Sequence, residues 1–404
     1  MSDNMLKVDV TIVGAGLVGL SAAVAMSKAG HEVVLVDQQI HTADSQLVDT
    51  DWDQRIYAIS PKNVQWLSSL GVWQLLDTSR IGEMQAMEIW GDATATPLSL
   101  LAEDDNADDL GFIVEERVLR KALVKQVQAC GIRTLFGSKC KVLNSTPKQA
   151  TLQLDNQQAI ESSLLIAADG ANSWVRQQLG IAVEQKQYQQ TAIVANFITE
   201  QPHNNIARQW FRQEWVSSDA GGHCDILAWL PLPGNKISIV WSAPSQYAES
   251  LMQLEAAAFS HEVMQAGNAT LGQLTMISAP AAFPLVLKKA EALVRGSVVL
   301  AGDAAHRIHP MAGQGVNLGF RDIVDLTEIL SSRHLYQPIN DSSLLKIYTR
   351  VRKADLSNML MLTNGLYHLF ESQNLAVQKV RNWGLSATNL QAIKKRLVRQ
   401  AITL

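Results

Sequence analysis

The sequence predicts an α/β fold with three parts: a parallel sheet flanked by helices, a mostly antiparallel sheet, and a helical C-terminal region. Three observations predict this fold. A strand, a glycine turn, a helix and a strand occupy residues 8–37, repeated β-type runs occupy residues 191–244, and helical periodicity dominates after residue 323. At 404 residues the chain is longer than one hydrophobic core usually supports, so we expect about two domains.

The first unit has the pattern of a dinucleotide-binding turn. Residues 8–13 are apolar, a G-x-G-x-x-G turn and a helical pattern follow, and a second β-rich run ends at Asp37. In such a unit Gly14 makes the tight turn, Gly16 lets the backbone reach a pyrophosphate, and Gly19 lets the helix pack closely on the strand. Asp37 would accept hydrogen bonds from an adenosine ribose. The pattern does not distinguish FAD from NAD.

A second glycine-rich stretch, GDAAHRIHPMAGQGVNLGFRD at residues 302–322, follows a short apolar strand. It reads as an acidic turn and then a Pro- and Gly-rich loop that runs into a helix near Gln314. Gly313, Gly315 and Gly319 would bring the backbone close to a flat or anionic ligand, and the helix would aim unpaired N–H groups at it. A tight turn between two core elements would explain only one of these glycines.

Composition and charge argue against several classes of function. The net charge of −4 argues against nucleic acid as a partner, because phosphate binding needs a concentrated basic surface. Cys130, Cys140 and Cys224 form no C-x-x-C pair, so we assign no metal site and expect a reducing, cytoplasmic setting. With no signal peptide or apolar run of spanning length in the sequence, we expect a soluble or membrane-peripheral protein. Ten tryptophans and eleven methionines hint at an apolar cavity, although filling of the core explains them more simply.

Between the two glycine-rich stretches the periodicity predicts further elements. A helix is expected at 61–70, an acidic loop at 98–109 and an amphipathic helix at 114–129. Short β runs between 132 and 160 suggest a small hairpin layer.

Two smaller features bear on function. An apolar strand ends in a second acid-glycine turn, Asp169-Gly170. Arg55 follows the first unit, where it is placed to pair with a cofactor phosphate or a substrate. Taken alone, it would more often be a surface arginine paired with Asp51 or Asp53.

Three signatures stand together in this chain: GAGLVG near the start, AADGANSWVR at 167–176, and the stretch at 302–322. In that order and at those separations they resemble the FAD-dependent aromatic hydroxylases of the p-hydroxybenzoate hydroxylase type. Within that group, QRIYAIS at 54–60, NGLYHLF at 364–370 and RNWGL at 381–385 are similar to the ubiquinone-biosynthesis hydroxylases.

The resemblance implies a domain arrangement. It combines a Rossmann-like FAD-binding domain, a mostly antiparallel β-sheet substrate domain and a helical C-terminal region. The expected boundaries are 1–75, 98–180 and 286–335 for the FAD-binding domain, 76–97 and 181–285 for the substrate domain, and 336–404 for the C-terminal region.

The resemblance also implies roles for individual residues. The ADP part of FAD would be held by Gly14, Gly16, Gly19 and Asp37, and the pyrophosphate and the path of NAD(P)H would lie near Asp169 and Gly170. The Gly302-Asp303 turn would hold the ribityl chain through Asp303. The isoalloxazine ring would be flanked by Pro310, Gly313, Gln314, Gly315, Val316 and Asn317. Arg55, Pro310 and Gly315 would line the flavin edge and position the substrate.

Two positions depart from the family pattern. Residue 37 is Asp where relatives often have Glu, which shortens the reach of the side chain but keeps the hydrogen-bond acceptor. Glu115 and Glu116 stand where many relatives of the wider group place Arg or Gln toward the flavin, so we expect no cofactor contact from this helix start.

The implied reaction is hydroxylation of the aromatic ring of a polyprenylated phenol in ubiquinone biosynthesis, through a C4a-hydroperoxide of the reduced flavin formed with O2. Because the chain has only one dinucleotide fingerprint, NAD(P)H should act as a transient co-substrate. The reactive flavin needs a dry site, for which the tryptophan-bearing sheet at 191–244 is the candidate lid. His223, His306 and His309 are candidates for proton transfer by residue type, but histidines in such loops are more often structural, so no general base is assigned.

Several alternatives stay open. The substrate could instead be a small soluble aromatic acid, or the chain could be a non-catalytic FAD-binding component of an assembly. A membrane-borne substrate implies peripheral attachment to the inner face of the membrane and contact with other ubiquinone-biosynthesis proteins. The basic residues Lys394, Lys395, Arg396 and Arg399 would serve such attachment, or form a solvated face of helices packed on the FAD domain.

Overall fold

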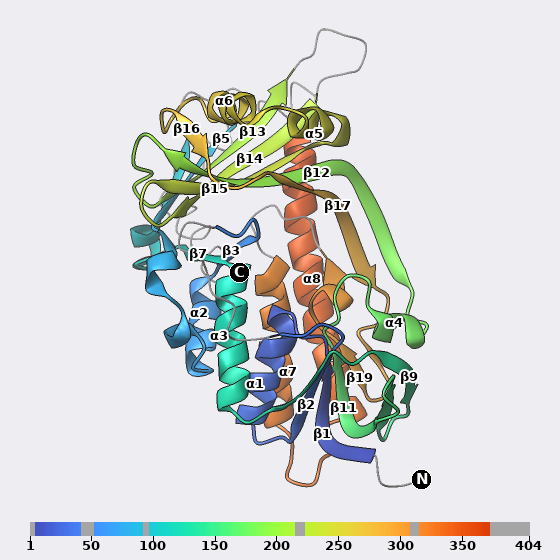
Figure 1. The fold of residues 1–404 in the computed structure, drawn as a ribbon. Helices are drawn as coiled ribbons and strands as arrows, with labels where there is room; N and C mark the ends of the chain where they lie inside the picture. The colour runs from blue at the N-terminus through green and yellow to red at the C-terminus, as the bar shows by residue number, and fades with distance from the viewer. Residues whose placement is uncertain (1–4, 42–51, 92–96, 215–222, 308–314, 372–404) are drawn as a thin grey trace.

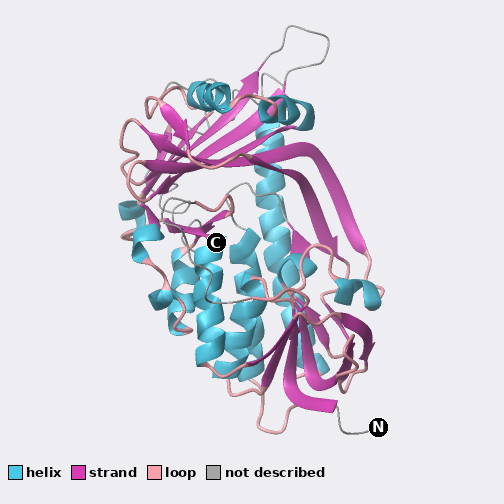
Figure 2. Cartoon of the chain, in the orientation of Figure 1, coloured by secondary structure: helices cyan, strands magenta, loops and turns pink. Residues whose placement is uncertain are grey.

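The computed structural model describes residues 5–41, 52–91, 97–214, 223–307 and 315–371. The molecule has two halves (Figure 1): a parallel sheet with helices packed beside it, and a larger, mostly antiparallel sheet that lies across the ends of these helices. Helices dominate the first half and strands the second (Figure 2). This arrangement confirms the predicted α/β fold.

The parallel sheet has the strand order β18-β19-β11-β1-β2-β8. Its strands are β1 (Met5–Val13), β2 (Val33–Asp37), β8 (Arg133–Phe136), β11 (Ala159–Ala167), β18 (Val294–Arg295) and β19 (Val298–Leu300). β1 pairs in parallel with β2 and β11, and β11 pairs in parallel with β19, so these four strands end at one edge. The predicted hairpin is β9 (Cys140–Ser145) and β10 (Ala150–Leu154), which extends this sheet through β11 instead of forming a separate layer.

Three helices lie side by side next to the parallel sheet (Figure 1): α1 (Leu17–Lys28), α3 (Glu116–Ala129) and α7 (Gly315–Ser331). α1 lies between the other two, and its nearly uniform apolar and small residues suit burial on all sides. The helix predicted at 61–70 is α2 (Pro61–Ser69), which has Ser60 as its N-cap and a proline at its first position. α3 begins at Glu116, later than predicted, because residues 111–115 form a strand. A short helix, α4 (Trp174–Gln178), follows β11.

The second sheet has the strand order β20-β17-β12-β15-β14-β13-β5-β6, with β16 beside β12. Its strands are β5 (Ala86–Trp90), β6 (Leu98–Leu101), β12 (Val183–Thr199), β13 (Ile206–Glu214), β14 (His223–Leu232), β15 (Lys236–Pro244), β16 (Leu274–Met276), β17 (Ala281–Ala290) and β20 (His306–Arg307). All of its pairings are antiparallel except that of β13 with β5. Two helices, α5 (Ser245–Met252) and α6 (Ala256–Ala266), cover its outer face (Figure 1).

A small sheet, β3 (Ile56–Ile59), β7 (Gly111–Glu115) and β4 (Gly82–Met84), joins the two halves. Trp52, Ile113 and Leu232 pack together where this sheet meets the second sheet.

The acidic loop predicted at 98–109 is wrong in its first part, where β6 and the short 3₁₀ helix η3 (Ala102–Asp105) lie. Leu98 and Leu100 alternate with their neighbours and are buried against Leu110. The acidic residues occupy the first turn of η3, where the helix dipole favours negative charge. The many acidic residues after Leu101 therefore concealed the alternation of buried and less buried residues that is typical of a strand.

The tryptophans of the second sheet do not face the first half of the molecule. Trp210, Trp229 and Trp241 are at most 3% exposed and share a core with Phe259 of α6. The simpler interpretation, that these residues fill the core, is therefore correct for this cluster. The opposite face of the sheet must supply any wall toward the glycine-rich motifs.

The last described helix, α8 (Ser342–Glu371), runs from the first half to the second (Figure 1), and its side chains are described as far as Met361. Leu345 and Tyr348 belong to the core of the first half, whereas Leu356 and Met359 pack in a cluster with residues of the second sheet. The helical pattern expected after residue 323 is thus present to residue 371. The domain boundaries given above remain our proposal, with the difference that β6, residues 98–101, pairs within the second sheet.

Candidate functional site

Four of the predicted features meet at one edge of the parallel sheet. The glycine turn follows β1, Asp37 ends β2, Asp169 follows β11, and Gly302 follows β19. Because these strands are parallel, their carboxyl ends lie together, which is where open α/β sheets bind ligands. The topology therefore brings together residues that are nearly 300 positions apart.

The turn after β1 needs glycine at two positions for different reasons. Gly14 has φ +104°, and a Cβ at Gly19 would lie 1.8 Å from the carbonyl oxygen of Gly14. In contrast, a Cβ at Gly16 would meet nothing within 4 Å. Gly16 is also the N-cap of α1, and no side chain caps this helix start. The positive end of α1 is thus open to an anion.

Asp37 holds the same turn. Its carboxylate accepts hydrogen bonds from the backbone N–H of Ala15, at 2.5 Å, and of Gln39, at 2.7 Å. The side chain thus links the end of β2 to the glycine turn beside it.

Asp169 has one oxygen satisfied and one not. Oδ2 accepts a hydrogen bond from the Val175 N–H at 3.0 Å, whereas Oδ1 is buried without a hydrogen-bond partner in the described part of the chain. Desolvation raises the pKa of this carboxyl, against the lowering effect of its hydrogen bonds from Ser173 and Val175. Arg176 donates to the carbonyl oxygens of Ala304 and Ala171, at 2.8 and 2.9 Å, and so ties this motif to the one that follows β19.

The turn after β19 is the 3₁₀ helix η4 (Gly302–Ala304). Gly302 has φ +58°, and a Cβ there would lie 3.1 Å from Cγ2 of Val18 in α1. At Gly319 the corresponding distance is 2.6 Å. The expectation that Gly319 brings the backbone close to a ligand is therefore wrong: the space that its missing side chain leaves is filled by Val18, which lets α1 and α7 pack closely.

Asp303 has solvent-accessible surface, but protein atoms surround its carboxyl group closely enough to remove much of its hydration. Desolvation is the largest influence on its carboxyl and raises the pKa, while Arg307, His306, Arg55 and Lys288 act in the opposite direction. The structure thus brings Asp303 and Arg55 of the QRIYAIS stretch into the same electrostatic environment.

Arg55 pairs with Glu116 and with no surface aspartate in the described part of the chain. Its Nη1 lies 3.2 Å from Oε2 of Glu116, and its guanidinium lies over the ring of Phe283 at 5.9 Å. The Coulomb attraction of Glu116 raises the pKa of Arg55. Asp53 accepts hydrogen bonds from the backbone N–H groups of Arg55 and Arg117, at 3.0 and 3.1 Å.

Glu116 is a site residue that the sequence did not reveal. Its side chain is 9% exposed and also contacts Arg120 and, at 3.5 Å, the hydroxyl of the largely buried Tyr57. Burial is the main reason why the pKa of Tyr57 is raised, and Glu116 and Asp303 add to the shift. Glu115, in contrast, is fully buried in ion pairs with Arg80 and Arg117 and is structural.

The start of α7 is fixed by Asn317. Its Oδ1 accepts hydrogen bonds from the Ser60 N–H at 3.2 Å and the Asn63 amide at 2.9 Å, and its Nδ2 donates to the Ala58 carbonyl at 2.7 Å. This side chain therefore anchors the helix to β3 and α2. Gly315 and Val316 precede it in the first turn, where backbone N–H groups point out of the helix. Pro310, Gly313 and Gln314 lie outside the described residues.

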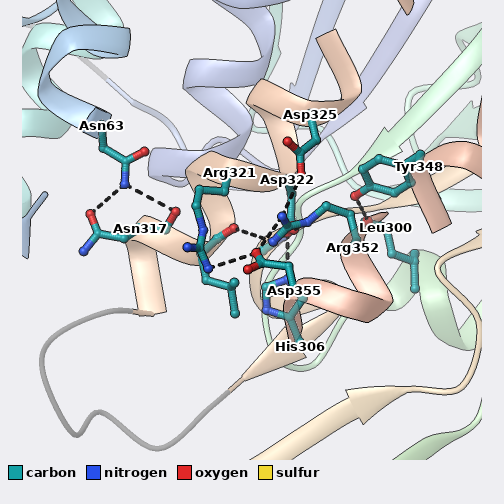
Figure 3. Close-up of polar contacts among 12 residues, drawn as sticks. Asn63, Leu300, His306, Asn317, Arg321, Asp322, Asp325, Tyr348, Arg352 and Asp355 are labelled. Atoms are coloured by element: carbon teal, nitrogen blue, oxygen red, sulfur yellow. Dashed lines mark hydrogen bonds and ion pairs between the residues drawn. The ribbon is translucent and has the colours of Figure 1, made fainter. Parts of the chain in front are cut away.

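His306 is structural, as expected for a histidine in such a loop. It is 4% exposed, and its Nε2 lies 2.8 Å from Oδ2 of Asp322 (Figure 3). The predicted candidate His309 lies outside the described residues, as does the side chain of His223.

The inner face of the second sheet has an apolar centre, with buried polar side chains on either side of it. Val194, Val240 and Ala228 are register partners on β12, β15 and β14, and all three are half-buried. They alternate with the residues of the tryptophan core, so they point to the other side of the sheet. Val240 packs near Leu318 of α7, which places this face toward the first half of the molecule.

The residues present fit FAD. The uncapped start of α1, the open space at Gly16 and the unsatisfied oxygen of Asp169 suit a phosphate-bearing ligand with hydroxyl donors. Asp303 offers a further acceptor at the same edge of the sheet.

Comparisons with known proteins agree with this geometry. A model of the FAD-binding domain family matches residues 7–363. The chain is 31% identical to the mitochondrial ubiquinone biosynthesis monooxygenase COQ6 of Mus musculus, over 94% of this chain and 88% of that protein. It is 33% identical to the 3-demethoxyubiquinol 3-hydroxylase of Escherichia coli, over 96% of both chains.

Two solved structures support the fold alone, because their sequence identity to this chain is low. The p-nitrophenol 4-monooxygenase PnpA of Pseudomonas putida has a TM-score of 0.76, with 16% identity over 99% of both chains. HpxO of Klebsiella pneumoniae, complexed with FAD and uric acid, has a TM-score of 0.73, with 15% identity over 98% of this chain and 97% of that one. The chain therefore belongs to the FAD-binding domain family and, within it, to the ubiquinone biosynthesis monooxygenases, so that it is an FAD-dependent monooxygenase.

Proposed function

We propose that this monooxygenase hydroxylates the aromatic ring of a polyprenylated phenol in ubiquinone biosynthesis, with NAD(P)H as transient co-substrate and O2 as oxidant. The observation that carries the proposal is the position of the apolar patch of Val194, Val240 and Ala228, on the inner face of the second sheet, opposite the edge where the glycine motifs and Asp303 meet. Such a face suits a prenylated ring and keeps water away from the reacting atoms.

We further propose the cofactor roles expected from the sequence. Gly14, Gly16 and Gly19 shape the start of α1 for the pyrophosphate, with Asp37 and Asp169 as hydrogen-bond acceptors nearby. Asp303 accepts from the ribityl hydroxyls, Gly302 and Gly170 give the turns their shape, and Gly315, Val316 and Asn317 direct N–H groups toward the flavin ring, beside Pro310, Gly313 and Gln314. Bound FAD would supply the redox chemistry, namely reduction by NAD(P)H and activation of O2.

Arg55 positions the substrate in this proposal. Its side chain is 60% exposed while Glu116 holds the guanidinium at one end. An arginine held in this way can donate to a phenolic oxygen and favour its anionic form, which makes the ring more electron-rich. Replacing Glu116 by Gln should therefore raise KM for the phenol several-fold and leave FAD content unchanged. A loss of FAD with unchanged KM would contradict this role.

The function is tested by substrate-dependent NAD(P)H oxidation with detection of the hydroxylated product. We expect turnover with a polyprenylated phenol and little with small soluble aromatic acids. Turnover of only the soluble acid would overturn the quinone assignment, and a colourless protein that takes up no flavin would indicate a non-catalytic component of an assembly.

The substrate also implies peripheral contact with the inner face of a membrane and with other ubiquinone-biosynthesis proteins. No helix within the described ranges is long and apolar enough to cross a bilayer. Co-sedimentation with anionic phospholipid vesicles tests the attachment, and absence of binding at low salt would overturn it.

A further inference from the structure

Asp322, at the end of the third motif, is a buried hub for three segments of the chain. Its Oδ2 accepts hydrogen bonds from the Gly302 N–H and from His306 Nε2, both at 2.8 Å, and its Oδ1 accepts from Arg352 Nε at 2.6 Å. The side chain is 1% exposed. A carboxylate at this depth is stable only when it is paired and hydrogen-bonded.

Arg352 brings a guanidinium to this hub from α8 (Figure 3). Its side chain is 2% exposed, and its Nη1 lies 2.7 Å from carboxylate oxygens of both Asp325 and Asp355. The guanidinium is thus held in one orientation, with Nε directed at Asp322. These contacts join α8 to α7 and, through Asp322, to the turn after β19.

The turn that carries Asp303 is therefore fixed from both sides by one carboxylate. Gly302, which donates its N–H to Asp322, precedes Asp303, and His306 follows it by three residues. In the strand before the turn, the Leu300 carbonyl accepts a hydrogen bond from the Tyr348 hydroxyl of α8 at 3.0 Å. The direction of the Asp303 carboxyl thus depends on contacts that α8 completes.

We propose that Arg352 is a positioning residue for the cofactor: through Asp322 it holds the Gly302–Asp303 turn in the geometry that binds FAD. The inference rests on the proposed role of Asp303 at the ribityl chain. It makes α8, which reaches the turn through this hub and the preceding strand through Tyr348, a part of the cofactor site.

The test measures FAD affinity and apoprotein stability separately in matched variants. Arg352→Met removes the charge at the hub. Arg321→Met is the control, because the Arg321 side chain is 12% exposed and also joins α7 to α8, through an ion pair of 2.9 Å with Asp355, but in the described part of the chain it makes no hydrogen bond or ion pair with Asp322. FAD titration of the full-length apoprotein by flavin fluorescence gives Kd, and thermal melting without FAD gives Tm.

Both variants should lower the Tm of the apoprotein, but only Arg352→Met should raise the Kd for FAD, by about tenfold or more, as expected when a charged hydrogen-bond network is broken. Arg352→Lys keeps the charge but not the fork of donors, so its Kd should lie between those of the wild type and Arg352→Met. An unchanged Kd in Arg352→Met, or an equal rise in Arg321→Met, would overturn the proposal. If Arg352→Met does not fold, the Kd of Arg352→Lys decides: a value equal to that of the wild type overturns it.

A double mutant shows whether the effect passes through the turn. If it does, adding Arg352→Met to Asp303→Asn should raise the Kd no further than Asp303→Asn alone. Independent, multiplying effects would show that Arg352 acts elsewhere. A wild-type protein without affinity for FAD would instead contradict the proposed function itself, so the two failures are distinguishable.

Discussion

Asp303 combines a functional position with an energetic cost to the fold. Desolvation raises the pKa of its carboxyl in the folded protein, so the unfolded chain holds the ionised form more easily. A raised folded-state pKa means that ionisation disfavours the folded state once the pH exceeds the ordinary value of an aspartate, and that this effect is absent below it. The carboxylate is thus a place where we expect stability and cofactor binding to oppose each other.

Asp303→Asn should therefore stabilise the apoprotein at neutral pH while weakening FAD binding. The gain in Tm should shrink as the pH falls toward about 4, because the wild-type carboxyl then becomes protonated in the folded state and increasingly so in the unfolded state. Melting curves of both apoproteins between pH 4 and 8 check this, together with flavin titration at pH 7. A gain in Tm that is independent of pH would show that the charge of Asp303 is not its cause.

Asn317 illustrates a residue whose side chain serves the fold at the edge of the site. Asn317→Ala leaves the buried Ser60 N–H and the Ala58 carbonyl without this side-chain partner and removes the shorter of two hydrogen bonds that the Asn63 amide donates to residue 317. We expect a loss of about 2 to 4 kcal/mol in the free energy of unfolding, measured with denaturant on the apoprotein. The exposed Asn144 is the control, and its replacement by Ala should change stability by less than about 0.5 kcal/mol. Equal effects would contradict the anchoring role.

The residues that the sequence revealed are those in local patterns. Gly14, Gly19 and Asp303 stand at fixed spacings next to a strand, so their surroundings are set by a few neighbours in the chain. Glu116 and Arg352 act on residues 61 and 30 positions away, and nothing in the local pattern predicts such partners. Only the topology of the folded chain brings them together.

At the level of elements, the start of α1 separates two kinds of glycine. Gly19→Ala has no room, because its Cβ would lie 1.8 Å from the Gly14 carbonyl oxygen, whereas Gly16→Ala meets only open space. Gly16→Ala should therefore cost at most about 1 kcal/mol of apoprotein stability and yet weaken FAD binding about tenfold or more, because the new methyl group would lie where the pyrophosphate approaches.

Apoprotein melting and FAD titration distinguish these variants. Gly19→Ala should lower both the Tm of the apoprotein and the affinity for FAD, whereas Gly16→Ala should lower mainly the affinity for FAD. Unchanged affinity in Gly16→Ala would show that the pyrophosphate lies elsewhere.

The elements themselves were predictable to different degrees. α1 and its flanking strands follow from a strong local motif, and α2 from its serine cap and proline. β6 was hidden by the acidic residues after it, and the outward direction of Trp210, Trp229 and Trp241 could not be predicted, because alternation along a strand shows that two faces differ but not which of them meets a neighbouring domain.

At the scale of the molecule, α8 links the two halves, as the small sheet of β3, β7 and β4 also does. Arg352, Leu356 and Met359 are spaced by four and three residues and so share one face of the helix. Arg352 reaches the turn of Asp303, while Leu356 and Met359 pack with Tyr188, Ala192 and Leu285 of the second sheet. One helix thus contacts both the turn of Asp303 and the second sheet.

Removing apolar contacts between α8 and the second sheet should loosen this sheet and leave the residues at the proposed cofactor site unchanged. Leu356→Ala leaves a cavity beneath the second sheet and should cost about 2 to 5 kcal/mol of stability. With the sheet less firmly held, water should enter the site, and more NAD(P)H should be consumed without hydroxylation. Leu345→Ala, at an equally buried position of α8 that packs in the core of the first half, should cost similar stability but keep the ratio of product to NAD(P)H. The measurement is the amount of hydroxylated product per NAD(P)H oxidised in each variant. An equal fall of this ratio in both variants would mean that general loss of stability, and not the contact of α8 with the second sheet, controls access of water.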